Sequence, residues 1–288
     1  MEGMAPYRDV LNPASEFWEK CARHTNRQTA RKIQAVYLCD ECAIRLTREA
    51  FNDRPPIHHG ETLQGFCGLC NESKTVVARF WFACDICWNV VLGYQKSGAA
   101  SRAVLRYWND QCAEALPRLA LLETEPVYLS PYQRGGKTKR QTAEGLSVLD
   151  FRVEQRGEPT NPLFHIELKS GPGSIDEMKE FQLDINDSND IIGAAKNTGL
   201  PVYIFHVQLQ RVYTAATVAT IGGGMWWTDI FTLLENKHAE RSRRGEDKQA
   251  GYYSPSAFKP IASFCQALQE ENYTILRERL ASEPLDFS

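Results

Sequence analysis

The sequence predicts an α/β protein in which a small cysteine-rich domain precedes a larger domain with a mixed sheet. Seven of the nine cysteines lie before residue 90, and 288 residues leave room for two domains. Apolar and polar residues alternate along residues 146–169, as in paired strands. A helical pattern and then a run of β-branched and aromatic residues follow, up to residue 209.

The N-terminal cysteines occur as short clips. There are three CxxC pairs and one CxxH pair, which together supply eight ligands for two tetrahedral zinc sites. If neighbouring clips share an ion, the sequence predicts two sequential units of zinc-ribbon type. An interleaved pairing of the clips is the alternative. The two predicted sets are Cys21, His24, Cys39 and Cys42, and Cys67, Cys70, Cys84 and Cys87.

Whether the cysteines bind zinc or form disulfides depends on the redox state of the compartment in which the protein resides. The first residues, MEGMAPYRDVLNPASEF, lack a basic region followed by an apolar run, so we expect a cytoplasmic protein. Thiols stay reduced there, which favours metal binding. No apolar run is long enough to cross a membrane. Cys112 and Cys265 lie in apolar contexts and are expected to be core thiols.

Three segments organise the chain. We expect a zinc-binding domain in residues 1–97, a connecting helix in residues 98–125 and a second domain in residues 126–288. The connecting helix follows from amphipathic spacing over residues 98–122, interrupted near Pro117.

Residues 146–169, LSVLDFRVEQRGEPTNPLFHIELK, predict a β-hairpin. Two apolar runs flank RGEPTNP, whose glycine, asparagine and prolines favour a turn over a strand interior. We expect the turn to be centred between Glu158 and Pro159.

This hairpin would place two acids and a lysine on one face. Asp150 would lie opposite Glu167, and Val148 opposite Lys169. The other face would be entirely apolar, so a shift by one residue would bury the polar set. The alternative is an ordinary hairpin with a solvated charged face. The apolar face would consist of Leu149, Phe151, Val153, Phe164, Ile166 and Leu168.

A helix and a strand should follow. Ser174 and Glu177 have the spacing of a capping box, and residues 197–201 contain turn formers that would end the helix. Residues 202–209 predict a buried strand. The aromatic residues of 221–264 are expected to pack on the flank of the sheet, with a target-recognition loop as the alternative.

The order Asp150, then Glu167-Leu168-Lys169, resembles the motif of the PD-(D/E)xK nuclease superfamily, which includes many type II restriction endonucleases. The resemblance covers residues 140–210, and Leu149 stands where the motif has proline. It implies a restriction-endonuclease-like core and a magnesium-dependent DNA endonuclease. More narrowly, it implies a type II restriction enzyme that cuts double-stranded DNA as a homodimer.

The resemblance also assigns roles to residues. Asp150 and Glu167 would bind magnesium through hard oxygen ligands, and Lys169 would stand beside the attacking water. Gln182 matches a helical glutamine found in some members. Glu144 matches an acid that a preceding helix supplies in many members. An exposed helical glutamine and a surface glutamate are the ordinary alternatives.

The net charge of the chain and its local basic patches indicate how the protein would bind DNA. With 33 basic and 36 acidic residues, the chain does not have the charge of a protein that coats DNA nonspecifically. A local patch just before the hairpin is expected to contact phosphates, and residues 237–248, read as helix to loop, form a weaker patch. The first patch comprises Arg134, Lys137, Lys139 and Arg140.

Two other functions stay open. One is a different nuclease on the same core, such as a homing, repair or mobile-element enzyme. The other is a non-catalytic, zinc-dependent DNA-binding regulator, in which the zinc clips carry the function and the hairpin is scaffold.

Overall fold

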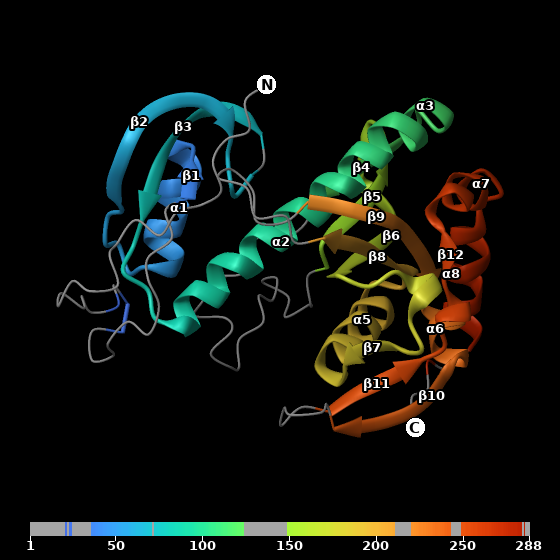
Figure 1. The fold of residues 1–288 in the computed structure, drawn as a ribbon. Helices are drawn as coiled ribbons and strands as arrows, with labels where there is room; N and C mark the ends of the chain where they lie inside the picture. The colour runs from blue at the N-terminus through green and yellow to red at the C-terminus, as the bar shows by residue number, and fades with distance from the viewer. Residues whose placement is uncertain are drawn as a thin grey trace. The chain divides into compact units, whose positions relative to one another are not determined.

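The structure is a computed structural model that describes most of the chain (Figure 1). The described residues are 21, 23–24, 36–70, 72–123, 149–210, 220–242, 249–283 and 285. The chain divides into two compact units, and the division within helix α2 (Asp85–Tyr107) falls between Ala99 and Ala100.

The first unit contains a three-stranded antiparallel sheet and helix α1. The sheet has the order β1-β3-β2, and α1 (Asp40–Ala50) follows β1 directly. The strands are β1 (Val36–Leu38), β2 (Ile57–Phe66) and β3 (Ser73–Phe80).

The core of this unit is small and rich in cysteine. Seven of its buried or half-buried residues are the clip cysteines, packed with Leu38, Leu46 and Phe51. Phe51 stacks on Trp81 with ring centroids 4.5 Å apart, and the Trp81 indole donates to the Arg54 carbonyl at 2.8 Å. So small an apolar core favours additional stabilisation by metal.

The second unit is built on a six-stranded sheet of order β12-β9-β8-β6-β5-β4. β6 and β8 are parallel, whereas β4–β5, β5–β6 and β9–β12 are antiparallel, which confirms the predicted mixed sheet. Its strands are β4 (Leu119–Glu123), β5 (Phe151–Gln155), β6 (Glu158–Gly171), β8 (Val202–Gln210), β9 (Thr220–Asp229) and β12 (Lys259–Pro260).

The predicted hairpin is β5 and β6. Phe151 pairs with Ile166 and Val153 pairs with Phe164, so the predicted register is confirmed over these pairs. Asp150 directly precedes the first residue of β5.

The predicted position of the turn is wrong. The strands are joined through Arg156 and Gly157, and Gly157 has a φ of 84°. Glycine adopts such a positive φ at low cost, so the chain reverses there instead of between Glu158 and Pro159. Two irregularities between Val153 and Gln155 absorb the difference in register.

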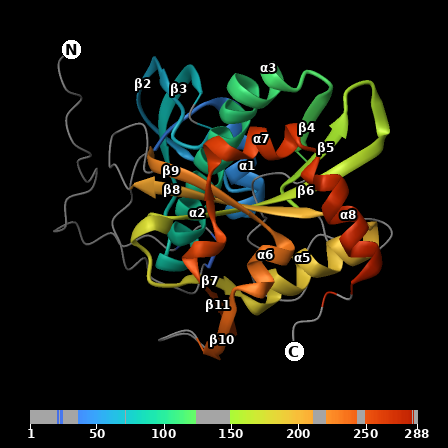
Figure 2. The ribbon, with the colours of Figure 1, turned by 90° about the vertical axis from the view of Figure 1, so that its right-hand side faces the viewer.

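The apolar face of the hairpin is buried as predicted. Phe151, Val153, Phe164 and Ile166 are fully inaccessible to solvent. Helices α7 (Phe264–Gln269) and α8 (Asn272–Ser282) lie on this side of the sheet (Figure 2). The Phe164 ring meets Phe264 and Tyr273 at centroid distances of 6.5 and 5.6 Å.

The segment after Lys169 differs from the prediction. Ser174 caps only a 3₁₀ turn, Ile175–Glu177, and the helix begins at α5 (Ile185–Thr198). Strand β7 (Phe181–Asp184) intervenes, and its alternating burial shows why it pairs in a sheet instead of continuing a helix. The predicted end is confirmed, because α5 stops at Gly199, which has a φ of 64°.

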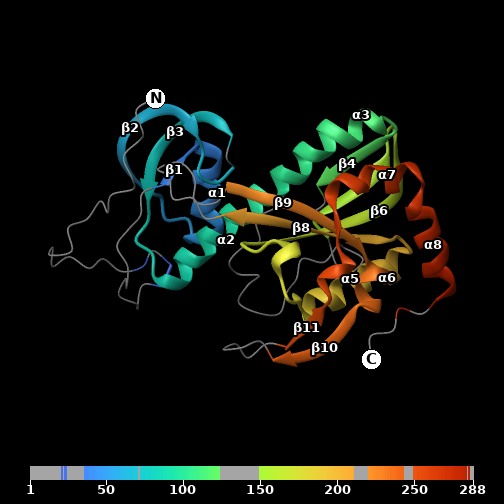
Figure 3. The ribbon, with the colours of Figure 1, turned by 45° about the vertical axis from the view of Figure 1, so that its right-hand side comes forward.

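A second, three-stranded antiparallel sheet has the order β10-β11-β7. It contains β10 (Lys237–Ser242) and β11 (Gln249–Tyr253), and the short helix α6 (Ile230–Glu235) precedes β10. The predicted helix-to-loop reading of residues 237–248 is therefore wrong where the structure describes it. Figure 3 shows α5 and this small sheet on the opposite side of the larger sheet from α7.

The bounds predicted for the connecting helix also need correction. Helix α2 begins at Asp85, continues as a π-helix over Trp108–Cys112, and is followed by the short α3 (Ala113–Ala115). Pro117 then ends the helical region, and the following apolar residues form β4 because β5 offers them a pairing partner.

The aromatic residues of 221–264 pack in the core as expected. Trp226, Trp227, Tyr252, Tyr253, Phe258 and Phe264 are all buried. Within the described part of the chain, no helix has both the length and the apolar character needed to cross a membrane.

Candidate functional site

The polar face of the hairpin carries an ion-pair cluster centred on Lys169. The Lys169 Nζ donates to Glu167 Oε1 at 2.7 Å and to Asp187 Oδ2 at 2.9 Å. Glu167 and Lys169 lie on β6, two residues apart and therefore on the same face, and Asp187 lies in the first turn of α5. The exposed fractions of these side chains are 21% for Lys169, 16% for Glu167 and 38% for Asp187.

Asp150 belongs to the same end of the hairpin. Its Oδ2 accepts the backbone N–H of Leu168 at 2.8 Å, between Glu167 and Lys169 in the chain. Extending the register by one pair beyond Phe151 and Ile166 would place Asp150 opposite Glu167. The structure thus brings Asp150, Glu167 and Lys169 together.

Electrostatics keep Lys169 charged. Burial alone would lower the pKa of Lys169, but the Glu167 and Asp187 carboxylates outweigh it and raise the pKa above its ordinary value. The cluster therefore holds a permanent cation between two carboxylates at neutral pH.

Two histidines flank the cluster. His206 on β8 pairs with Lys169, and its Nε2 donates to the Gly173 carbonyl at 2.9 Å. His165 lies opposite Arg152 on β5, and burial, assisted by Arg152, lowers the pKa of His165 to about 4. Both imidazoles are therefore neutral at physiological pH.

Other predicted site residues lie elsewhere. Gln182 is on strand β7, exposed and paired with Tyr252, so its predicted place on a helix is wrong. Glu144 and the basic residues Arg134, Lys137, Lys139 and Arg140 lie outside the described residues.

Sequence reasoning missed Asp187. An acidic residue in the first turn of a helix is common and does not by itself indicate a site. Asp187 is identified as a site residue because the structure shows that α5 begins at Ile185. The signal that could have found it is the NDS sequence at residues 186–188, which follows the alternating residues 181–184 after Ile185 and marks a helix start.

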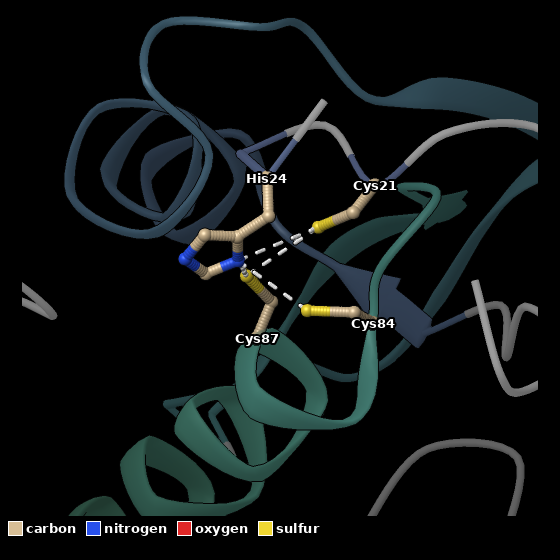
Figure 4. A group of neighbouring side chains, drawn as sticks. All are labelled: Cys21, His24, Cys84 and Cys87. Carbon is tan, nitrogen blue, oxygen red and sulfur yellow. Dashed lines mark hydrogen bonds between the residues drawn. The ribbon is translucent and has the colours of Figure 1, made fainter. Parts of the chain in front are cut away.

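The clip residues of the first unit form two clusters that could hold zinc. Within each cluster, the candidate ligand atoms all lie within 4.8 Å of one another. One cluster contains Cys21, His24, Cys84 and Cys87 (Figure 4), and the other contains Cys39, Cys42, Cys67 and Cys70.

The pairing of the clips is nested, so the predicted pairing of neighbours is wrong. The first clip joins the fourth, and the second joins the third. The β2–β3 hairpin causes this, because its connection carries Cys67 and Cys70 back towards β1. There the Gly68 N–H donates to the Tyr37 carbonyl at 2.7 Å, two residues before Cys39.

Distances within the clusters fit a tetrahedral ion. Zn–S bonds of about 2.3 Å in a tetrahedron imply ligand atoms roughly 3.8 Å apart. Cys21 and Cys87 sulfurs are 3.6 Å apart, and those of Cys39 and Cys70 are 3.9 Å apart. His24 points its Nδ1 at the Cys84 sulfur, 3.3 Å away (Figure 4).

Hydrogen bonds between the clip thiols lower the pKa of one cysteine in each cluster. Cys39 immediately precedes α1 and Cys84 immediately precedes α2. The hydrogen bond from Cys87 lowers the pKa of Cys21 to about 3, and hydrogen bonds from Cys42 and Cys70 lower the pKa of Cys67. Each cluster thus favours a thiolate even before an ion displaces the remaining protons.

Comparisons with known proteins add little to this geometry. No family model and no curated protein matches the chain. Among solved structures, the chain is similar to D212, a nuclease from a fusselovirus, at 10% identity and a TM-score of 0.30. The match covers 62% of this chain and 90% of that chain. A TM-score this low does not support a functional assignment, so the proposed function rests on the residues of this chain.

Proposed function

We propose that this protein is a magnesium-dependent DNA endonuclease of the PD-(D/E)xK type. The observation that carries the proposal is the polar face of the β5–β6 hairpin, where Asp150, Glu167 and Lys169 come together. Two carboxylates beside a lysine match the requirements of metal-assisted phosphodiester hydrolysis.

The donor set suits magnesium. Asp150 and Glu167 offer only oxygen ligands, and magnesium prefers a few carboxylate oxygens together with water and phosphate oxygens. The Lys169 ammonium already occupies a cation position against Glu167, which shows that this carboxylate attracts positive charge. When bound, the ion would polarise the scissile phosphate and lower the pKa of a water ligand.

Each residue would have a distinct part. Asp150 would be oriented by its hydrogen bond from the Leu168 backbone, which fixes one oxygen and aims the carboxylate. Glu167 would supply the second carboxylate, and Lys169 would stabilise the negative charge that develops on the phosphate. His165 is half-buried, His206 is buried and both are neutral, so they support the strands without exchanging protons with the substrate.

The rest of the chain would serve DNA binding. We infer that the second unit carries catalysis, that helix α2 connects it to the N-terminal part of the chain, and that residues 1–97 bind two zinc ions and help to hold double-stranded DNA. Arg134, Lys137, Lys139 and Arg140 would contact phosphates. A type II restriction enzyme acting as a cytoplasmic homodimer is the narrower form of this proposal, and Gln182 and Glu144 have no part assigned in it.

Plasmid cleavage tests the proposal. With magnesium, the wild-type protein should convert supercoiled plasmid or phage DNA into discrete fragments, and without magnesium it should not. Asp150→Asn and Glu167→Gln should each slow cleavage more than about 100-fold, because even the loss of a group that only orients a metal ligand costs 10–100-fold. Glu177→Gln, which alters an exposed acid on the 3₁₀ turn, is the matched control and should cleave normally.

Three results would contradict the proposal. Cleavage that survives both substitutions would remove the assignment of the two acids. Cleavage without any divalent ion would remove the metal. DNA binding without cleavage of any tested DNA would favour a zinc-dependent regulator.

A further inference from the structure

Lys169 is held by a carboxylate that the proposed reaction does not use. Asp187 reaches it from α5, eighteen residues further along the chain, at 2.9 Å. Glu167 reaches it from the same strand at 2.7 Å. Two separate elements thus hold one ammonium group.

The contact of Lys169 with Glu167 competes with metal binding at Glu167. An ammonium 2.7 Å from Glu167 Oε1 occupies one of the two carboxylate oxygens that a divalent ion could approach. Two cations on one carboxylate repel each other, most strongly where water is partly excluded. If Glu167 is to bind an ion, Lys169 therefore needs another anionic partner.

Asp187 is placed to be that partner. Its backbone is fixed, because α5 buries Ile191, Ile192, Ala194 and Ala195. The neighbouring Ser188 is buried and lies within hydrogen-bond distance of the Tyr253 hydroxyl of β11, 3.2 Å away. Asp187 is the more exposed of the two carboxylates, so keeping it charged costs less desolvation.

We propose that Asp187 is a positioning residue that holds the Lys169 ammonium away from Glu167 when Glu167 binds the divalent ion. The proposal rests on the proposed function, because it takes Glu167 as a metal ligand. Asp187 acts through Lys169 and is not itself a ligand of the ion. Without Asp187, Lys169 competes with the ion for Glu167.

The affinity for Mn²⁺ separates this role from the others. We would measure it in the zinc-loaded full chain without DNA, from the spectroscopic signal of free Mn²⁺. Asp187→Asn should weaken Mn²⁺ binding about 10-fold, the size of effect seen when groups that orient metal ligands are lost. Asp187→Glu should restore most of the affinity, and Asp190→Asn, one turn along α5, should change it less than about twofold.

The decisive variant is Lys169→Met, which removes the competing cation. In that background Asp187→Asn should no longer change Mn²⁺ affinity, because residues that act through each other are not additive. If the loss persists there, Asp187 is a metal ligand and the proposal is wrong. If Asp187→Asn leaves the affinity unchanged in the presence of Lys169, the proposal is wrong as well.

Failure of the proposed function looks different. Glu167→Gln would then bind Mn²⁺ as tightly as the wild type, which overturns Glu167 as a ligand and the inference with it. If Glu167→Gln loses affinity but the Asp187 variants behave differently from the prediction, only the role of Asp187 is lost.

Discussion

Burial fixes the protonation state of His206, one of the residues beside the candidate site. It is 3% exposed, its Nε2 donates to the Gly173 carbonyl, and its Nδ1 is buried without a partner among the described residues. Protonating Nδ1 would add a buried donor with no acceptor, so burial lowers the pKa of His206 despite the hydrogen bond. A neutral tautomer is therefore part of the fold.

This predicts a loss of stability in mild acid. The unfolded chain takes up a proton near pH 6.5, whereas folded His206 does so only at lower pH. Stability is thus fully present above about pH 6.5 and falls as the pH drops below it. The variant His206→Gln keeps an amide donor for Gly173. Its free energy of unfolding, measured with denaturant, should differ less between pH 7.5 and pH 5.5 than that of the wild type. An equal difference in both proteins would contradict the assignment.

At the scale of elements, helix α5, which carries Asp187 in its first turn, ends at Gly199. Gly199 adopts a φ of 64°, and a Cβ built there would meet nothing within 4 Å. Gly199→Ala should therefore destabilise the protein by roughly 1–2 kcal/mol through backbone strain alone.

Gly193 in the middle of α5 is the matched control. A Cβ there also has open space, but the backbone is helical. Gly193→Ala should stabilise by roughly 0.5–1 kcal/mol, the opposite sign. Urea unfolding of both variants measures the two changes, and destabilisation by Gly193→Ala would show that α5 is not the helix described.

The nested clips give an equally sharp test by zinc counting. Cys21→Ser combined with Cys84→Ser removes two ligands of one cluster, so the protein should keep one zinc per chain. Under sequential pairing the same two changes would damage both sites. Elemental analysis of the purified double variant, and of Cys39→Ser with Cys67→Ser, distinguishes one zinc from none.

These elements also show where sequence reasoning stops. The hairpin register could be predicted, because Phe151, Val153, Phe164 and Ile166 must all face the core. The pairing of the clips could not be predicted, because it depends on where the β2–β3 hairpin places Cys67 and Cys70. Asp187 was missed because strand β7 was not predicted, and this strand delays the start of α5.

At the scale of the whole molecule, two different sets of candidate metal ligands lie in separate parts of the chain. The first unit gathers soft sulfur and imidazole ligands, which suit zinc. The second gathers oxygen ligands at the end of a hairpin, which suit magnesium. A net charge of −3 gives the molecule no general attraction for DNA, so binding would depend on local patches.

Iron-mediated backbone cleavage tests, without any DNA, whether a divalent ion binds at Asp150 and Glu167. Fe²⁺ would replace magnesium in the zinc-loaded protein, and ascorbate with peroxide would generate radicals that cut the chain close to the ion. If the ion binds there, the chain should be cut near Asp150 and near Glu167 to Lys169. Excess magnesium should suppress these cuts, and Glu167→Gln should abolish them. Cuts confined to other parts of the chain, or unchanged in Glu167→Gln, would contradict binding of the ion at these residues.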